Sequence, residues 1–353
     1  MPDFFELYRS HYSNTIFDPS WLIKDTYPFL DAKYQTTQLI DAYFENYTPL
    51  WTELMNDGKF LEAAKFIAAF PLRFAYYWEN TNKKPLHKGT PYYFLGVSKI
   101  ASDDLDEGFL YMHQALEEDK RTYNVQQPPT PAYCFVTLDY TKQNQFFLQR
   151  VVQVSDFLEQ KLGSYRQQAS GALTLGDFKN RFLEQVQLQE AVFYFVLLLH
   201  KLLAHSFLDG RLKANVMASL QESNLLFSLI LSVDATLKNK DPDQNHHLFR
   251  QFLVFLAQTS RPPLGITDGD LTRLSGEFSN DFGRTLDDLL NSRYVPNSGV
   301  KFTAMEENIA IAHGLRNFGA HRIEYEPSIT SNFDSILQRM FNLLFFSIEQ
   351  LYP

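Results

Sequence analysis

The sequence has little of what marks disulfide-rich, zinc-binding or duplex-DNA-binding proteins. Its 353 residues include a single cysteine, Cys134, so neither an intramolecular disulfide nor a cysteine-rich zinc site can form, and a reducing compartment is favoured. Lysine and arginine number 32 against 41 aspartates and glutamates, a net charge of −9 that leaves no long basic stripe for duplex DNA. Any contact with nucleic acid must therefore be local.

Signals for export and membrane insertion are lacking as well. Met1 to Glu6 carry acidic residues and no basic flank before an apolar core, which is unlike a secretory signal. The longest apolar run, Ala191 to Leu199, is closed by His200 and Lys201 and is too short to span a bilayer. We therefore expect a cytoplasmic protein with no membrane insertion.

Hydrophobic residues make up 45% of the chain, and their spacing is helical almost throughout. Three- and four-residue steps run from about Lys179 to Phe207, from about Ala214 to Leu237, and from Asn332 onward. The last stripe consists of Phe333, Ile336, Leu337, Met340, Phe341, Leu344, Ile348 and Leu351. Period-two alternation is rare, and its best candidate for a strand is Tyr133 to Leu138. The sequence predicts an all-α fold.

A proline cluster, Pro128, Pro129 and Pro131, predicts a boundary within this helical chain, because each proline lacks an amide donor and restricts the residue before it. We expect a helical N-terminal part over residues 1–124 and a proline-marked linker and connecting region over 125–179. A second helical domain would follow over 180–353.

Small and large residues in the N-terminal part have the spacing of helical hairpins. They are Tyr92, Leu95, Gly96, Gly108, Met112 and Ala115. A turn would lie at Ser102 to Leu105, and Trp51 to Ala64 is a second, looser match. Both resemble tetratricopeptide hairpins, in which small residues let two antiparallel helices touch. They lie farther apart than the usual period of about 34 residues, so we expect an insertion near Asn80 to Lys84. An irregular helical bundle is the alternative, and either makes this half a scaffold or sensor.

The hexapeptide Arg316 to His321, RNFGAH, is the strongest candidate for chemistry. Imidazole transfers protons near neutral pH, and guanidinium can hold a phosphate with two parallel hydrogen bonds. Thr303 to Glu306 has the form of a capping box, which predicts a helix from about Ala304 to Ile323. Its apolar side would carry Ile311, Leu315 and Phe318, and its polar side His313, Asn317 and Ala320, flanked by Arg316 and His321. Gly319 would allow a small kink that brings these two flanking residues closer.

Arg316-Asn317, two residues, then Ala320-His321 on a long helix before a final amphipathic helix resembles the HEPN superfamily. These are all-helical domains, many of them metal-independent endoribonucleases, and several act in toxin, CRISPR-associated and abortive-infection systems. The resemblance covers about residues 180–353. It implies that Arg316 stabilises the scissile phosphate, that His321 acts as general acid or base, and that Asn317 orients either group. It also implies a homodimer, because the chain has one such motif and HEPN enzymes pair two.

These roles predict cleavage of single-stranded RNA without a metal or other cofactor. A ribose 2′-hydroxyl would attack the neighbouring phosphorus, and a fixed guanidinium would stabilise the extra charge of the transition state. Products would carry 2′,3′-cyclic phosphate and 5′-hydroxyl ends, and DNA would not be cut. The acids Glu306, Glu307, Glu324 and Glu326 would oppose RNA binding, so further basic groups would be needed from Arg250, Arg284, Arg293 or a partner protomer.

Two alternatives stay open for the hexapeptide. Cationic residues near a helix C-terminus are favoured by the helix dipole alone, which would make the match a coincidence. A non-catalytic HEPN-like domain would instead serve dimerisation, with the N-terminal hairpins binding a protein partner.

Other histidines carry weaker patterns. His246 and His247, near Asp241, Asp243 and Asn245, are expected in a solvated loop and not at a metal site. His200 and His205 lie on an apolar helix, where satisfied or partly exposed histidines are usual. His313, one turn before Arg316, is a possible auxiliary to catalysis, with plain surface placement as the favoured alternative.

Overall fold

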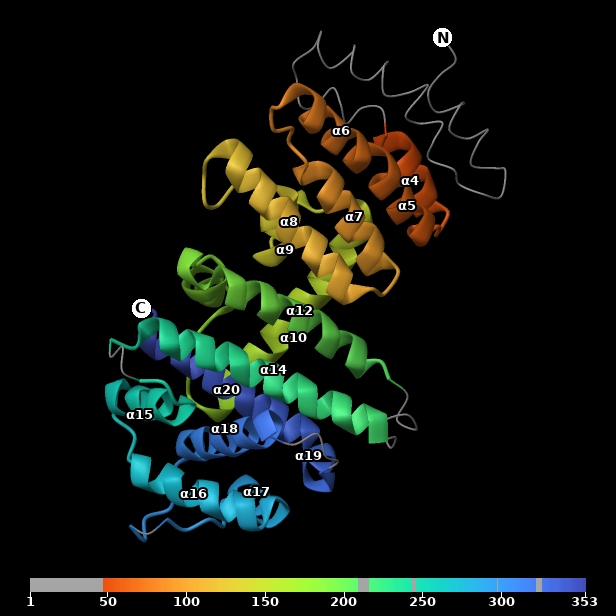
Figure 1. The fold of residues 1–353 in the computed structure, drawn as a ribbon. Coiled ribbons are helices and arrows are strands. Elements are labelled where there is room, and N and C mark those ends of the chain that lie inside the picture. The colour runs from red at the N-terminus through yellow and green to blue at the C-terminus, as the bar shows by residue number, and fades with distance from the viewer. Residues whose placement is uncertain (1–46, 209–215, 243–245, 297, 322–325) are drawn as a thin grey trace, which may run out of the picture. The chain divides into compact units, whose positions relative to one another are not determined.

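The computed structural model describes residues 47–208, 216–242, 246–296, 298–321 and 326–353, and within these ranges it is helical with no strand. The predicted all-α fold is therefore confirmed (Figure 1). The chain divides into two compact units, each described by itself below. Unit 1 comprises Met1–Phe135 and Asp139–Val151, and unit 2 comprises Val136–Leu138 and Val152–Pro353. The division falls inside the stretch 125–179 that the prolines marked.

Unit 1 contains two helical hairpins in succession. Their helices are α4 (Thr48–Asn56), α5 (Phe60–Ile67), the π-helical segment η2 (Ala68–Leu72), α6 (Arg73–Asn82), α7 (Gly89–Ala101) and α8 (Leu105–Tyr123). The turn between α7 and α8 lies where it was expected, and Asp103 within it has φ 63°. Residues 60–82 are helical throughout. The predicted insertion near Asn80 to Lys84 is therefore the end of one long helix and the turn that follows it.

Glycines bring α7 and α8 together in the second hairpin. A Cβ on Gly108 would overlap Ile100 Cγ1, and one on Gly96 would lie 3.0 Å from the Gly108 carbonyl oxygen. Trp51 of α4 stacks on Phe94 of α7 at 4.1 Å between ring centroids, and its indole nitrogen donates to Ser98 Oγ at 2.8 Å. The small residues thus have the packing role that their spacing predicted.

The strand predicted over Tyr133 to Leu138 is wrong. Most of it is the short helix α9 (Pro131–Val136), followed by η3 (Tyr140–Lys142) and the long α10 (Gln145–Gln168). Phe135 packs against the rings of Phe109 and Phe147, each 5.1 Å away, so a buried helical turn accounts for the apolar run as well as a strand would.

Unit 2 is a bundle built around α14 and α20. Its elements are α11 (Leu175–Phe178), η4 (Lys179–Leu183), η5 (Val186–Leu188), α12 (Gln189–Ser206), α14 (Val216–Lys240), α15 (Phe249–Thr259), α16 (Asp268–Asn280), α17 (Phe282–Leu290), α18 (Ala304–His321), α19 (Pro327–Ser331) and α20 (Phe333–Leu351). The apolar stripe predicted for the last helix is buried except at its end, Leu351. α14 contacts α12, α18 and α20, which gives α18 a long neighbour across the bundle.

Two helical stretches of unit 2 are long and apolar enough to cross a membrane by length and composition. They are Val186–Ser206 and Val216–Lys240, and 50% of each apolar window is buried inside the protein. Part of their apolar surface therefore belongs to the core of the bundle.

Candidate active site on helix α18

The helix that carries the hexapeptide begins at the predicted capping box. Glu306 N donates to Thr303 Oγ1 at 3.4 Å, and Thr303 N donates to Glu306 Oε2 at 2.7 Å, so each side chain satisfies a free amide of the first turn. The other oxygen of Glu306 accepts from Gly265 N. α18 then runs to His321, and the expected end at Ile323 lies outside the described residues.

The apolar side of α18 packs as its spacing predicts. Ile311, Leu315 and Phe318 are buried, and the Phe318 ring lies 4.5 Å from that of Phe282 at the start of α17. A Cβ at Gly314 would overlap the Phe278 ring of α16. These contacts fix the rotation of α18 and thereby the direction of Arg316.

Arg316 faces α14, and two residues of that helix hold its side chain. Its guanidinium carbon lies 5.2 Å from the centre of the Phe227 ring, and its Nη2 lies 4.0 Å from Asp234 Oδ2. Its Nε is buried and has no hydrogen-bond partner among the described residues. Burial raises the pKa of Asp234, and the charge of Arg316 opposes that shift. The guanidinium is thus positioned by a ring and a distant carboxylate, and it forms no close hydrogen bond with another described residue.

Gly319 allows Phe227 to reach this position. A Cβ on Gly319 would lie 2.5 Å from Phe227 Cδ2, which is closer than real Cβ atoms approach other atoms. The glycine lies inside a continuous helix. Its lack of a side chain leaves space for the Phe227 ring beside Arg316.

His313 is buried, so its predicted placement on the surface is wrong. Its side chain packs against α16, where Nε2 contacts Ser275 Oγ at 2.7 Å, and the residue is 4% exposed. Burial, aided by the positive charge of Arg250, lowers its pKa to about 4. Asn317, one turn later, is exposed, and its Nδ2 lies 3.4 Å from His313 Nε2. A neutral imidazole therefore lies beneath an exposed amide.

The structure describes the backbone of α18 at Ala320 and His321 but not their side chains. Position 321 follows Asn317 by one helical turn. Arg322 and Glu324 lie outside the described residues altogether. The hexapeptide is thus described in full only from Arg316 to Gly319.

Three of the four acidic side chains expected to oppose RNA binding have partners within the fold. Glu306 and Glu307 are 6% and 3% exposed, and Glu307 pairs with Arg339 of α20 at 3.1 Å. Glu326 accepts from Ser328 N at 3.2 Å as the N-cap of α19. These carboxylates are therefore engaged within the fold, which weakens the objection they raised to RNA binding.

Two of the three arginines suggested as additional phosphate contacts are also engaged. Arg250 pairs with Asp268 at 2.7 Å and Arg293 with Asp288 at 3.1 Å. Arg284 is 80% exposed and lies 3.9 Å from Asp288. Of these three, Arg284 has the side chain that can turn most freely toward a ligand.

The weaker histidine patterns are only partly described. His246 Nδ1 contacts Asp241 Oδ2 at 2.8 Å, and the neighbouring Asp243 and Asn245 lie outside the described residues. Within the described ranges, no group of three or more histidine, cysteine, aspartate or glutamate side chains could hold a metal ion. His200 is buried, and His205 pairs with Glu222 at 3.2 Å inside unit 2.

Phe227 and Asp234 are parts of this site that the sequence did not reveal. Both lie in the middle of an apolar helix about eighty to ninety residues before the hexapeptide, and no local pattern connects an aromatic ring or a carboxylate there to Arg316. No protein-family model matches the chain, and neither the curated proteins nor the solved structures include a match. The resemblance to HEPN domains therefore rests on the residues themselves.

Proposed function

We propose that unit 2 is a metal-independent endoribonuclease of the HEPN type, which cleaves single-stranded RNA with Arg316, Asn317 and His321. The observation that carries the proposal is the state of Arg316. Its guanidinium lies on the face of Phe227, and its buried Nε has no hydrogen-bond partner among the described residues, which suits the group to receive a phosphate.

Another arginine of the same unit shows what a structural role looks like. Arg339 donates to Glu307 and Asn308 at 3.1 and 3.2 Å and to the Leu290 carbonyl at 3.0 Å, so its donors are used within the fold. Among the described residues, Arg316 pairs with Asp234 alone, at 4.0 Å. The contrast favours a ligand for Arg316, because its buried Nε is costly to leave without a partner.

The reaction would proceed through the ribose. One histidine removes the 2′-hydroxyl proton as a bond forms from O2′ to phosphorus, and the bond from phosphorus to O5′ breaks. A second histidine gives O5′ a proton, which leaves a 2′,3′-cyclic phosphate and a 5′-hydroxyl. The guanidinium of Arg316 stabilises the added charge on the non-bridging oxygens. Each chain has one hexapeptide, so two histidines require a homodimer.

Asn317 and His313 would support this chemistry without transferring the proton to O5′. With a pKa lowered to about 4, His313 is neutral at pH 7 and holds no proton to donate as a general acid. Its contact with Asn317 Nδ2 can instead hold the amide in the direction needed to orient a phosphate oxygen or an imidazole. We therefore assign His313 as a positioning residue.

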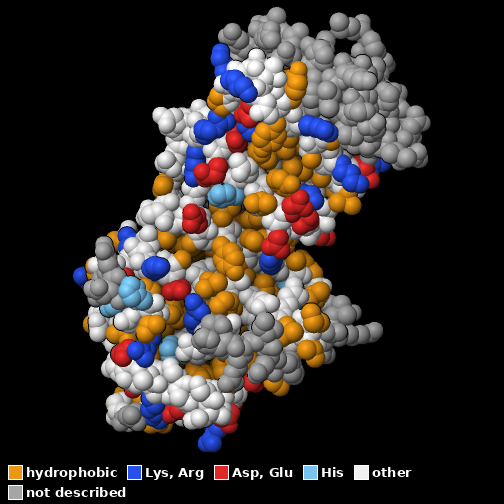
Figure 2. All heavy atoms as spheres, in the orientation of Figure 1, with side chains coloured by type: hydrophobic (Ala, Val, Ile, Leu, Met, Phe, Trp, Pro, Cys, Tyr) orange, Lys and Arg blue, Asp and Glu red, His pale blue; other side chains and the backbone are white. Residues whose placement is uncertain are grey.

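The wider role that fits this activity is a cytoplasmic, toxin-like or antiviral-defence effector, with unit 1 binding a protein partner. Basic side chains on the face seen in Figure 2 are interspersed with acidic ones and form no broad basic surface. RNA binding would then depend on local contacts such as Arg316, and selectivity for single strands would come from access to the site.

The test is cleavage of a single-stranded RNA by the purified full chain in EDTA. We expect Arg316→Ala and His321→Ala to abolish cleavage, Arg316→Lys to retain a small part, and His247→Ala, an exposed histidine of the same unit, to cut like the wild type. Intact RNA with the wild type, or equal cutting by all variants, would contradict the proposal. Toxicity on expression that disappears with His321→Ala would identify an enzyme that is active in cells and inhibited in the purified protein.

Two observations favour a second candidate, a non-catalytic interaction protein. Unit 1 consists largely of helical hairpins with close glycine contacts, and Asp234 partly neutralises Arg316. In that case unit 2 would serve only for dimerisation, and Asp234→Asn would not increase RNA binding. The ribonuclease proposal predicts that freeing Arg316 in this way tightens RNA binding, measured with a 2′-deoxy analogue that cannot be cut.

A further inference from the structure

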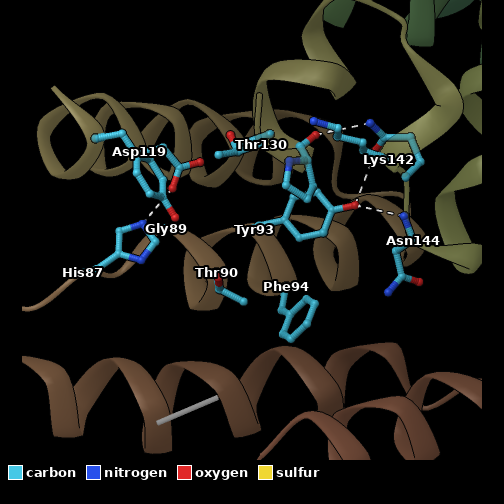
Figure 3. A pocket seen from close by; sticks show the side chains of 13 residues that line it. His87, Gly89, Thr90, Tyr93, Phe94, Asp119, Thr130, Lys142 and Asn144 are labelled. Atoms are coloured by element: carbon cyan, nitrogen blue, oxygen red, sulfur yellow. Dashed lines mark hydrogen bonds and ion pairs between the residues drawn. The ribbon is translucent and has the colours of Figure 1, made fainter. Parts of the chain in front are cut away.

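Unit 1 contains a cavity that the proposed ribonuclease activity does not use. It has a volume of about 310 Å³ and lies where the first turns of α7 meet the end of α8 and the loops on either side of α9 (Figure 3). This volume is at the lower end of the range for small-molecule sites, about 300–1,000 Å³. The cavity is therefore large enough for one compact ligand.

One end of the cavity offers a hydrogen-bond acceptor. Asp119 Oδ1 contacts His87 Nε2 at 2.7 Å, and the two side chains are 6% and 4% exposed. Gly89 makes room for this pair, since a Cβ there would overlap Asp119 Oδ1. The His87 contact involves only one carboxylate oxygen, which leaves Oδ2 as an acceptor for a ligand.

The other end offers donors. Lys142 Nζ donates to the Pro129 carbonyl at 2.8 Å, which brings its ammonium to the peptide that precedes Thr130. Thr130 Oγ1 lines the cavity, is buried, and has no hydrogen-bond partner among the described residues. An ammonium has three donors and a hydroxyl one, so both groups retain capacity for an anionic acceptor.

Aromatic side chains lie between the two ends. Figure 3 shows the Tyr93 ring between the Asp119 and His87 pair on one side and Lys142 and Asn144 on the other. Tyr93 follows Gly89 by four residues, a rise of about 6 Å along α7. Its hydroxyl is tied to Asn144 N at 3.2 Å, and burial raises its pKa to about 12, so the ring is fixed and uncharged. Phe94 is held by its stack on Trp51.

We propose that this cavity binds a free aromatic amino acid, with its ammonium on Asp119, its carboxylate on Lys142 and Thr130, and its ring against Tyr93 and Phe94. An acceptor at one end and a pair of donors at the other match a zwitterion, and the aromatic wall matches a flat apolar body. The ion pair of Asp119 with His87 would explain the acidic end alone. It does not explain a buried Thr130 hydroxyl left without a partner beside an ammonium.

The test is calorimetric titration of the full chain with L-phenylalanine, L-tyrosine and L-tryptophan. We expect one of them to bind with a stoichiometry of one per chain. Its decarboxylated amine and its deaminated acid should each bind at least about tenfold more weakly, because each loses one charge-assisted contact. No binding by any of the three, or equal binding by an analogue that lacks one charged end, would overturn the proposal.

Variants at the donor end avoid disturbing the buried Asp119 and His87 pair. Lys142→Gln and Thr130→Val should each weaken binding about tenfold, while Lys59→Gln, an exposed lysine of the same unit, should leave it unchanged. Thr130→Val should leave the thermal unfolding temperature unchanged or raise it, because the lost hydroxyl had no partner. Wild-type affinity in both donor-end variants would overturn the assignment. These outcomes are independent of RNA cleavage.

Discussion

At the scale of single residues, α18 places two ionisable side chains one turn apart in opposite environments. Arg316 lies at the surface against α14, where it is 27% exposed, and His313 lies under α16 at 4%. The helix carries both because its polar residues face different neighbouring helices. Arg316 faces α14, and His313 faces α16. The buried histidine can support the exposed amide of Asn317 only while it stays neutral, which couples this part of the site to pH.

The neutral state of His313 predicts a loss of stability in acid. Its pKa is near 6.5 in the unfolded chain and about 4 in the folded protein, so between these values the unfolded chain binds a proton that the folded protein does not. The stabilisation is complete above pH 6.5 and is lost as pH falls toward 4, by about 3 kcal/mol in total.

Urea unfolding of the wild type and His313→Gln across this pH range measures the effect. We expect the stability of the wild type relative to the variant to fall by about 3 kcal/mol between neutral pH and pH 4. Parallel pH curves for the two proteins would show that His313 does not cause the acid sensitivity.

At the scale of elements, the contact between α14 and α18 determines where Arg316 points. Phe227 projects into the space left by Gly319, and its ring supports the guanidinium. Asp234 lies seven residues further along α14, on the same side of that helix, and adds an opposite charge. The site is therefore built by two helices, and the hexapeptide supplies only one of them.

This packing predicts opposite effects of two glycine substitutions. Gly319→Ala should destabilise unit 2 by about 1–2 kcal/mol, because the Phe227 ring must move, and it should also weaken RNA binding by displacing Arg316. Gly276→Ala, in α16 with no atom within 4 Å of its Cβ, should stabilise the protein by up to about 1 kcal/mol. The denaturant midpoints of the two variants and the wild type measure both effects on stability. Equal effects at the two positions would contradict this account of the interface between α14 and α18.

The sequence predicts local features of these elements well and contacts between distant elements poorly. The capping box at Thr303, the turn before Leu105 and the glycine approach of α7 to α8 follow from short-range patterns and are present. The apolar run after Pro131 fits a strand or a buried helix equally, and tertiary packing decides for α9. Burial of His313 and the roles of Phe227 and Asp234 depend on which helices become neighbours, and a single sequence contains no signal for that.

At the scale of the whole molecule, the proposed reaction requires two chains. Each protomer provides one Arg316 and one His321, so a chain that lacks both should inactivate any wild-type partner with which it pairs. We expect a growing excess of the Arg316→Ala/His321→Ala double variant to reduce the specific activity of the wild type toward zero. An excess of His247→Ala should not. Unchanged wild-type activity in the presence of the double variant would contradict a shared site.

The central claim is that a 2′-hydroxyl is the nucleophile and that Arg316 and His321 serve it. The most direct test is mass spectrometry of the ends produced from one RNA and from the same strand with 2′-deoxy sugars, both in EDTA. We predict 2′,3′-cyclic phosphate and 5′-hydroxyl ends from the RNA, an intact deoxy strand, and no products with His321→Ala. Ends that carry a 5′-phosphate, or cleavage of the deoxy strand, would contradict the account.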